Sequence, residues 1–487
     1  MKKLVLTTMA LFFALMANAA DYDFVYDAFG NVKLYCKITK AATSTKTSGR
    51  GEITIVGGTG PSGSELFINL IEYNGYDYKP TAIVARAFEE ALWIEKLYLS
   101  NYTTSVGDYA FRNCTNLTNI TINQGVTFGK GEFYGCTSLV GVTIPQSITT
   151  IPDECFAECK GLKSLTIGRD VQTIGKDAFK SNQLTSLIIN SNYLTSQDYT
   201  EENNLTDLLG IEYVTFSTPP CHLSFGQFVT SIGDYAFYRA SLGELTIPQN
   251  IVSIGDMAFA RSPELATINI NSNQLVSKDY TDRYNLFFSF GLYTYSTTIV
   301  FGEGIESIGV KAFANNFGMN GGNIIQWAAY ATNKTSLVFP SSLRSIGEDS
   351  FYKMNIVTLT LPEGLKEVQN SAFSSCPFLS TVVIPSTMVN MNYFAFYRSP
   401  EIVTIYANAT NYEVYLALFS ATYDKTKAIV FVDDEYVYDY LKKNEEKCGR
   451  VVMLNGQVRP RVNEDVNEDG QVNSLDVLKV YKYMQSH

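Results

Sequence analysis

The sequence predicts an α/β repeat solenoid of about thirteen coils of 22–23 residues, with a parallel sheet on one side and short helical turns on the other. A small residue followed by phenylalanine recurs along the chain, and the phenylalanines at 88, 111, 133, 156 and 179 are spaced by 23, 22, 23 and 23 residues. Alternating apolar segments such as Leu162–Ile167 and Leu242–Ile247 recur in step with them. A fixed period of this length indicates stacked units, none of which buries its apolar face alone.

Composition agrees with an array and argues against several classes of function. The 487 residues exceed the length at which one globular core keeps growing. A net charge of −11 disfavours nucleic acid as a partner, because that affinity depends on Lys and Arg neutralising phosphates. The two histidines, His222 and His487, leave little scope for Ser-His, Cys-His or His-metal chemistry. We therefore predict that the protein is not an enzyme and assign no catalytic or cofactor-binding residue.

The N-terminus predicts export. Met1–Lys3 supplies a charged region, Leu4–Met16 an apolar core, and Ala17–Ala20 a small-residue cleavage site, so residues 1–19 fit a secretory signal peptide. No later stretch approaches the 18 or more uninterrupted apolar residues of a membrane span. We expect secretion through the Sec pathway to the extracellular space or the cell surface, and the periplasm remains an alternative.

Residues 20–80 are predicted to cap the first coil. This segment is rich in Tyr, Gly, Ser and Thr and has strand-like runs at 31–39 and 52–56. A solenoid needs a terminal unit with a polar outer face, and this segment has that composition.

Within residues 81–454, each coil is predicted to begin with a short strand and to turn at Ile-Gly-x-x-Ala-Phe, where phenylalanine enters the interior. Proline after several strands stops the hydrogen-bond ladder. We expect strands to end near residues 99, 122, 144, 167, 189, 225, 247, 270, 301, 339, 361, 384 and 406. An outward row of threonines should alternate with inward aliphatic residues: Thr121, Thr143, Thr166, Thr246 and Thr360.

Three coils are longer than the rest. Residues 190–200 resemble residues 271–281 at an offset of 81, so these two insertions share an origin, and a third expands the coil around 316–335. Insertions in repeat proteins often map to the binding face. The alternative, which we weigh equally, is that these insertions have no role in binding.

Eight cysteines follow the coil pattern rather than a disulfide pattern. Cys114, Cys136, Cys159 and Cys376 each lie three residues after a phenylalanine. We interpret them as buried thiols that fill the core, with disulfides between neighbouring coils as the alternative.

The array should close with a strand at 428–432 and a helix at 435–444, capped by Asp433 or Asp434. Residues 455–464 contain Pro460 and few apolar side chains, which indicates a linker.

The repeated L-x-x-L-x-I-P and S-I-G-x-x-A-F-x-x-C patterns resemble the BspA-like leucine-rich repeats of bacterial surface proteins over about residues 80–435. The resemblance implies a right-handed leucine-rich-repeat solenoid. In part of that family it also implies attachment to host matrix proteins, host cells or other bacteria.

Residues 465–487 have the pattern of a calcium loop followed by an apolar helix. Oxygen ligands at loop positions 1, 3 and 5, glycine at 6, a carbonyl at 7 and a carboxylate at 12 suit Ca²⁺. The segment resembles one repeat of a type I dockerin. That resemblance assigns calcium to Asp465, Asn467, Asp469, the Gln471 carbonyl and Asp476, with Asn473 acting through water, and partner contact to Ser474 and Leu475.

Two functions follow from these patterns. In the first, the solenoid of a secreted or cell-surface protein binds protein or glycan ligands on the host or on neighbouring microbes. In the second, the tail attaches the solenoid to a cohesin-like partner in an extracellular assembly associated with polysaccharide degradation. A dockerin has two calcium repeats, whereas this chain has one.

Overall fold

The computed structural model describes residues 22–44, 49–211, 220–282, 284–292, 295–315, 333–417, 421 and 423–454. Two compact units divide the chain. The first contains residues up to 197 together with 202–229, and the second contains residues 198–201 together with those from 230 onward. Each unit is described by itself.

The first unit opens with strands of the predicted cap. β1 (Phe24–Asp27), β2 (Lys33–Lys40) and β3 (Gly51–Thr59) form an antiparallel ribbon. β3 then pairs in parallel with β6 (Tyr76–Ile83), which also takes β5 (Ile71–Tyr73) on its other side. β4 (Ser64–Ile68) pairs in parallel with the first predicted coil strand. These strands therefore start the ladders that the coils continue. β6 runs across the boundary that we predicted between residues 80 and 81.

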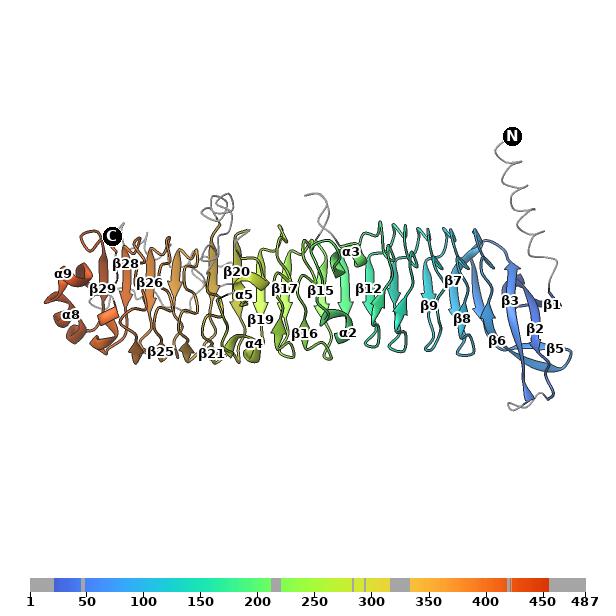
Figure 1. Ribbon diagram of the computed structural model, residues 1–487, viewed down its shortest axis with the longest axis horizontal. Coiled ribbons are helices and arrows are strands. Elements are labelled where there is room, and N and C mark those ends of the chain that lie inside the picture. The colour runs from blue at the N-terminus through green and yellow to red at the C-terminus, as the bar shows by residue number, and fades with distance from the viewer. Residues whose placement is uncertain are drawn as a thin grey trace, which may run out of the picture. The chain divides into compact units, whose positions relative to one another are not determined.

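All thirteen predicted coil strands are present within about one residue of their expected ends, which confirms the solenoid (Figure 1). Most of them pair in parallel with a strand one coil away, because the repeat places equivalent residues side by side, and the longer coils keep the same register. In the first unit they are β7 (Ile94–Leu99), β9 (Asn119–Thr121), β10 (Gly141–Thr143), β12 (Ser164–Ile167), β14 (Ser186–Ile189) and β15 (His222–Phe225). In the second they are β17 (Glu244–Ile247), β19 (Thr267–Ile270), β20 (Thr297–Phe301), β22 (Thr335–Val338), β24 (Thr358–Thr360), β26 (Thr381–Ile384) and β28 (Thr404–Ala407).

The return side of the coils differs from the short helical turns that we expected. Most returns contain a two-residue strand followed by a turn, and these strands form a second set of parallel ladders. Ser-Ile and Thr-Ile pairs extend here because β-branched residues favour the pleated backbone over a helix. The short strands are β8 (Ser105–Val106), β11 (Thr150–Ile151), β13 (Thr173–Ile174), β16 (Ser231–Ile232), β18 (Ser253–Ile254), β21 (Ser307–Ile308), β23 (Ser345–Ile346), β25 (Glu367–Val368) and β27 (Asn390–Met391).

Stacked phenylalanine rings form the centre of each core. In the first unit the rings of Phe88, Phe111, Phe133, Phe156 and Phe179 follow one another at centroid distances of 5.2, 5.5, 5.3 and 5.5 Å. In the second unit, Phe351 stacks between Phe313 and Phe373 at 5.4 and 5.3 Å. These spacings are close to the separation of adjacent strands, so one ring per coil fills the interior continuously.

The two related insertions adopt the same local structure. α2 (Asn192–Thr195) and α4 (Asn273–Ser277) are capped by Ser191 and Ser272, whose hydroxyls accept hydrogen bonds from Leu194 N and Leu275 N. α3 (Leu205–Leu209) and α5 (Leu286–Ser289) begin after asparagine caps. Leu194, Leu205, Leu275 and Leu286 are buried, so the helices replace return segments of their coils rather than decorate them. The third insertion lies mostly outside the described residues.

The cysteines are free and buried, as the coil spacing predicted. The Cys114, Cys136 and Cys159 thiols donate to Phe88 O, Phe111 O and Phe133 O of the preceding coil at 3.1–3.2 Å. Burial raises the pKa of Cys159 to about 12, so the thiol keeps its proton and its donor role.

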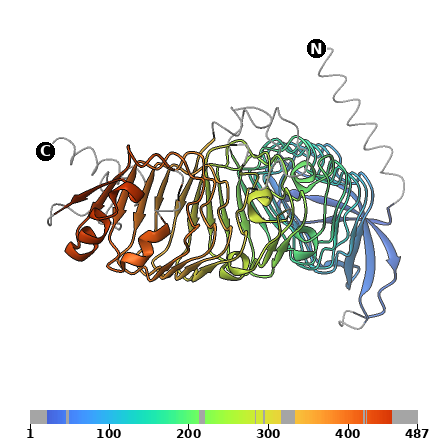
Figure 2. The same ribbon diagram turned by 60° about the vertical axis from the view of Figure 1, so that its left-hand side comes forward.

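The C-terminal end contains one strand more than we predicted. β29 (Ile429–Val432) and α8 (Glu435–Lys442) are confirmed, and the Asp434 carboxylate caps α8 by accepting from Val437 N at 2.9 Å. After α9 (Glu445–Cys448), β30 (Arg450–Met453) adds a further parallel strand beside β29. Figure 2 shows the strands of this unit side by side in chain order, with α8 at the far end of the row. The run Arg450–Met453 is too short to be recognised without its neighbour.

Candidate binding surfaces

From β9 to β15 the outward row of the main sheet is mostly small and polar, as predicted, whereas β4 and β7 carry Phe67 and Tyr98 in the same row. Thr143 lies opposite Thr166 in the register, Thr166 lies opposite Ile188, and Thr121 and Thr143 are exposed. Threonine stabilises a strand by its β propensity alone. Such a row carries few of the aromatic and arginine side chains that usually dominate protein recognition.

The turns around each phenylalanine present a second surface. In most coils the residues two before and two after the phenylalanine have left-handed backbones: Tyr109 and Asn113 around Phe111 have φ of 56° and 57°, and Glu154 and Glu158 around Phe156 have 57° and 58°. This conformation is uncommon for residues other than glycine. It repeats here because coil-to-coil hydrogen bonds impose it.

Those hydrogen bonds come from alternate backbone amides of the turn. Tyr109 N, Phe111 N and Asn113 N donate to Lys130 O, Glu132 O and Tyr134 O of the next coil at 2.7–2.9 Å. The backbone amides of every second residue in the turn therefore point toward the next coil. The surrounding hydrogen bonds offset the backbone strain, which is of order 1–3 kcal/mol for each residue.

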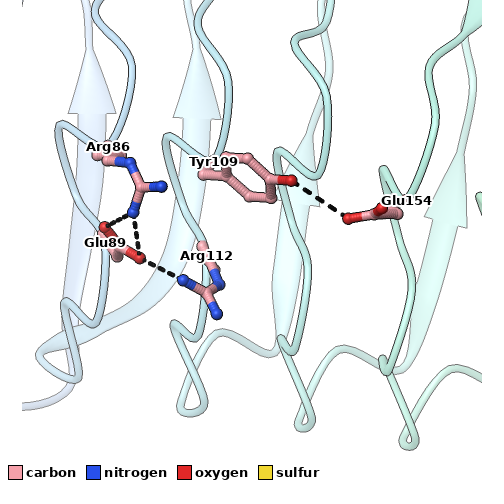
Figure 3. A network of polar contacts seen from close by, with 5 residues as sticks. All are labelled: Arg86, Glu89, Tyr109, Arg112 and Glu154. Carbon is pink, nitrogen blue, oxygen red and sulfur yellow. Dashed lines mark hydrogen bonds and ion pairs between the residues drawn. The ribbon is translucent and has the colours of Figure 1, made fainter.

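In the first unit this turn surface holds a network of arginine, glutamate and tyrosine (Figure 3). The Glu89 carboxylate accepts from Arg86 Nη1 at 2.8 Å and from Arg112 Nη1 of the next coil at 2.9 Å. The Tyr109 hydroxyl donates to Glu154 Oε2, two coils further on, at 3.2 Å. Polar contacts thus bridge four successive coils.

The arginines also contact the tyrosine ring. The guanidinium carbons of Arg86 and Arg112 lie 5.3 and 5.7 Å from the centroid of the Tyr109 ring, within cation–π range. A Cβ atom at Gly131 would overlap the Tyr109 ring. Glycine at this position therefore leaves the space through which the ring extends toward Glu154. The side chains of Arg86 and Arg112 remain 54% and 36% exposed. The cluster is therefore ordered and still accessible to a ligand.

The second unit has a related arrangement. The guanidinium carbons of Arg239 and Arg261 lie 5.5 and 5.8 Å from the Tyr238 ring centroid, and Tyr235 packs edge-on against that ring at 5.4 Å. The repeated turn therefore places arginine beside tyrosine in both units.

Glu132 occupies the turn position that is alanine in most other coils, and it is completely buried. Neither carboxylate oxygen makes a hydrogen bond of good geometry to a described residue. Burial raises the pKa of Glu132 well above its ordinary value, and the nearby Gly129 amide offsets only part of that effect. The surroundings of Glu132 therefore favour the neutral, protonated form of its carboxyl group.

Cys221 and His222 are adjacent in the sequence but do not meet through their side chains. Cys221 is buried, whereas the side chain of His222 is exposed and its Nε2 lies 3.3 Å from Ser224 Oγ. Within the described ranges, no group of three or more His, Cys, Asp or Glu side chains is arranged to hold a metal ion. The predicted signal peptide, calcium ligands Asp465–Asp476 and partner residues Ser474 and Leu475 lie outside the described residues.

Sequence reasoning missed the turn surface. The sequence signal was available: arginine recurs two residues after the coil phenylalanine at Arg239, Arg261 and Arg398, each with a left-handed backbone. The contact of Arg86 with the Tyr109 ring could not be read from the pattern, because it joins coils 23 residues apart.

Coils that pair in parallel, each turning around a buried phenylalanine and exposing a variable turn surface, define a leucine-rich-repeat solenoid protein. The chain belongs to the BspA type leucine-rich repeat region family, whose model matches residues 81–206, 216–325 and 323–441 in six copies. Repeat regions of this family are typically non-catalytic and bind ligands. No match was found among the curated proteins.

Three solved structures are similar to the chain. A leucine-rich repeat protein from Bacteroides ovatus is 20% identical, with 83% of this chain and 99% of that chain covered and a TM-score of 0.34. A leucine-rich cell surface protein from Faecalibacterium prausnitzii is 19% identical, with the same coverage and a TM-score of 0.32. The pneumococcal vaccine antigen PcpA is 13% identical, with 89% and 99% covered and a TM-score of 0.26.

Proposed function

We propose that the protein is a secreted, non-catalytic binding protein at the cell surface, whose first-unit turn surface binds a protein partner on host cells or neighbouring microbes. The observation that carries this proposal is the ordered cluster of Arg86, Tyr109 and Arg112 around Glu89. Arginine and tyrosine dominate the energetics of protein interfaces. Side chains already held by ion pairs lose less conformational freedom when a partner binds.

Export supports the same proposal. The expected signal peptide would bring the solenoid outside the cytoplasm, where such partners occur. In the described part of the chain no helix has the length and apolar character needed to cross a bilayer.

The double substitution Arg86→Gln and Arg112→Gln tests the proposed surface. We expect saturable binding of the mature protein to at least one member of an array of extracellular-matrix proteins and glycans, and at least tenfold weaker binding by the variant. The fold should survive, because exposed ion pairs contribute only about 0–1 kcal/mol each. Surface plasmon resonance on the captured ligand measures the affinities.

Lys160→Gln with Arg169→Gln is the matched control, since it removes two cations that are 64% and 48% exposed in the same unit. If both double variants lost the same binding affinity, the effect would be due to the change in net charge and the proposed surface would be rejected. Binding that survives the Arg86 and Arg112 substitutions would exclude this surface, and no saturable binding to any arrayed molecule would reject the proposal.

A second function, attachment to a cohesin-like partner, is favoured by the calcium-loop pattern of residues 465–476. We expect the mature chain to bind Ca²⁺ with a measurable heat, and Asp465→Ala to abolish that heat by removing the first loop ligand. Glu468→Gln is the control, because loop position 4 is not a ligand position. Titration calorimetry that detects no difference between these variants would remove the calcium assignment and, with it, this second function.

A further inference from the structure

The outward row of the main sheet changes character in the last strands of the second unit. Thr360 lies opposite Val383, and the same row continues through Tyr406, Phe431 and Val452 on β28, β29 and β30. Four consecutive strands therefore carry an apolar side chain where the first unit carries mainly threonine and serine. We call Val383, Tyr406, Phe431 and Val452 the apolar row.

The apolar row is covered at its centre. Val383 and Tyr406 are 0% and 1% exposed, and they pack with Phe431, whose ring stacks on that of Tyr406 at 5.2 Å. In the corresponding row of the first unit, Ile188 is also apolar but is 39% exposed. Side chains in one row of a sheet cannot enclose each other from above, so burial this complete requires a second layer over the face.

The chain itself offers that layer. β30 lies last in its sheet, and the chain remains at the sheet through Leu454, whose amide donates to Val432 O at 2.8 Å. Another 33 residues, 455–487, follow. The 22 residues between Leu454 and Val477 could extend about 70 Å, whereas the three strand spacings of the apolar row cover roughly 14 Å. The expected helix can therefore reach any part of the row.

The predicted tail helix has a matching surface. Val477, Leu478, Val480 and Tyr481 are apolar, and their spacing places most of them on one face of the expected helix. Covering the helix face and the apolar row together removes both from water, at about 25 cal/mol for each Å² of apolar surface. No charged side chain lies in the row to oppose the contact.

We propose that the C-terminal helix, from Val477 to Met484, docks on the apolar row of its own chain. The docking covers Val383 and Tyr406 and fixes the tail against the last strands of the solenoid. This proposal is independent of the partner-binding surface in the first unit. It also means that a partner of the tail would compete with the solenoid for the apolar side of the helix.

Site-specific photocrosslinking of the full mature chain tests the proposal. A benzophenone amino acid replaces Val452, which is half-buried at the end of the row, and crosslinked peptides are identified by mass spectrometry. We expect crosslinks within one chain to peptides from residues 475–487. The same amino acid at Thr143, in the outward row of the first unit, should give no tail crosslink.

A tail variant distinguishes specific docking from proximity. Leu478→Asp should lower the crosslink yield from position 452 several-fold, whereas Lys479→Asp, which changes charge beside it, should not. Neither substitution changes a residue of the solenoid itself. Crosslinks that join two chains would assign the row to a second copy and overturn the proposal, as would an absence of tail peptides or equal yields from the two variants.

Discussion

Phe351→Ala should lower the free energy of unfolding by about 3–5 kcal/mol, the usual cost of deleting a core aromatic ring. Phe351 is fully buried and stacks on Phe313 and Phe373 of the coils before and after it. It also makes edge contacts with Phe301 and Phe339 at 6.4 and 5.8 Å. Removing the ring interrupts the stack and leaves a cavity that two neighbouring coils must share.

The effect should be local. Because each coil contacts mainly its neighbours, faster hydrogen exchange is expected in the coils around Phe351 and much less in the first unit. Phe394→Ala is the matched control, since that ring is 45% exposed and belongs to the turn surface. Chemical denaturation and exchange mass spectrometry provide both readouts. A uniform rise in exchange along the chain would show that the coils unfold as one cooperative block.

Glu132→Gln should stabilise the protein at alkaline pH and have little effect at pH 4. The native pKa of Glu132 is raised, so the folded chain keeps a proton that the unfolded chain releases above about pH 4.3. The stability linked to this proton is complete below that pH and is lost as the pH rises toward the native pKa. The loss amounts to about 1.4 kcal/mol for each pH unit in that window. Glutamine has the same size and does not titrate.

Unfolding free energies of the variant and the parent should therefore diverge as the pH rises above about 4.3, with the variant becoming the more stable of the two. Glu154→Gln is the control, because that carboxylate is one-third exposed and lies on the same turn surface, one coil after Glu132. If the unfolding free energies of Glu132→Gln and the parent changed with pH in parallel, the raised pKa of Glu132 would be contradicted.

The period of the sequence was sufficient to predict much of the architecture. Thirteen strands, the buried phenylalanines, the outward threonines and the free cysteines were predictable, because each coil repeats the same local pattern and neighbours stack in register. The equivalence of the two insertions was also readable, since residues 190–200 and 271–281 share their capping serine and the following apolar residues. These features depend on contacts between residues at fixed separations in the chain.

Features set by contacts between coils could not be predicted from the pattern. β30 forms only because β29 offers it an edge, and Arg112 becomes part of a site only because Glu89 and Tyr109 face it across coils. Glu132 looked like a variant of a turn alanine, and only its surroundings make it a buried acid. The sequence by itself determined the repeat, the strand register and the core. The tertiary structure alone decided which exposed side chains meet, because side-chain contacts across the turns depend on rotamers and left-handed backbones that the repeat period does not encode.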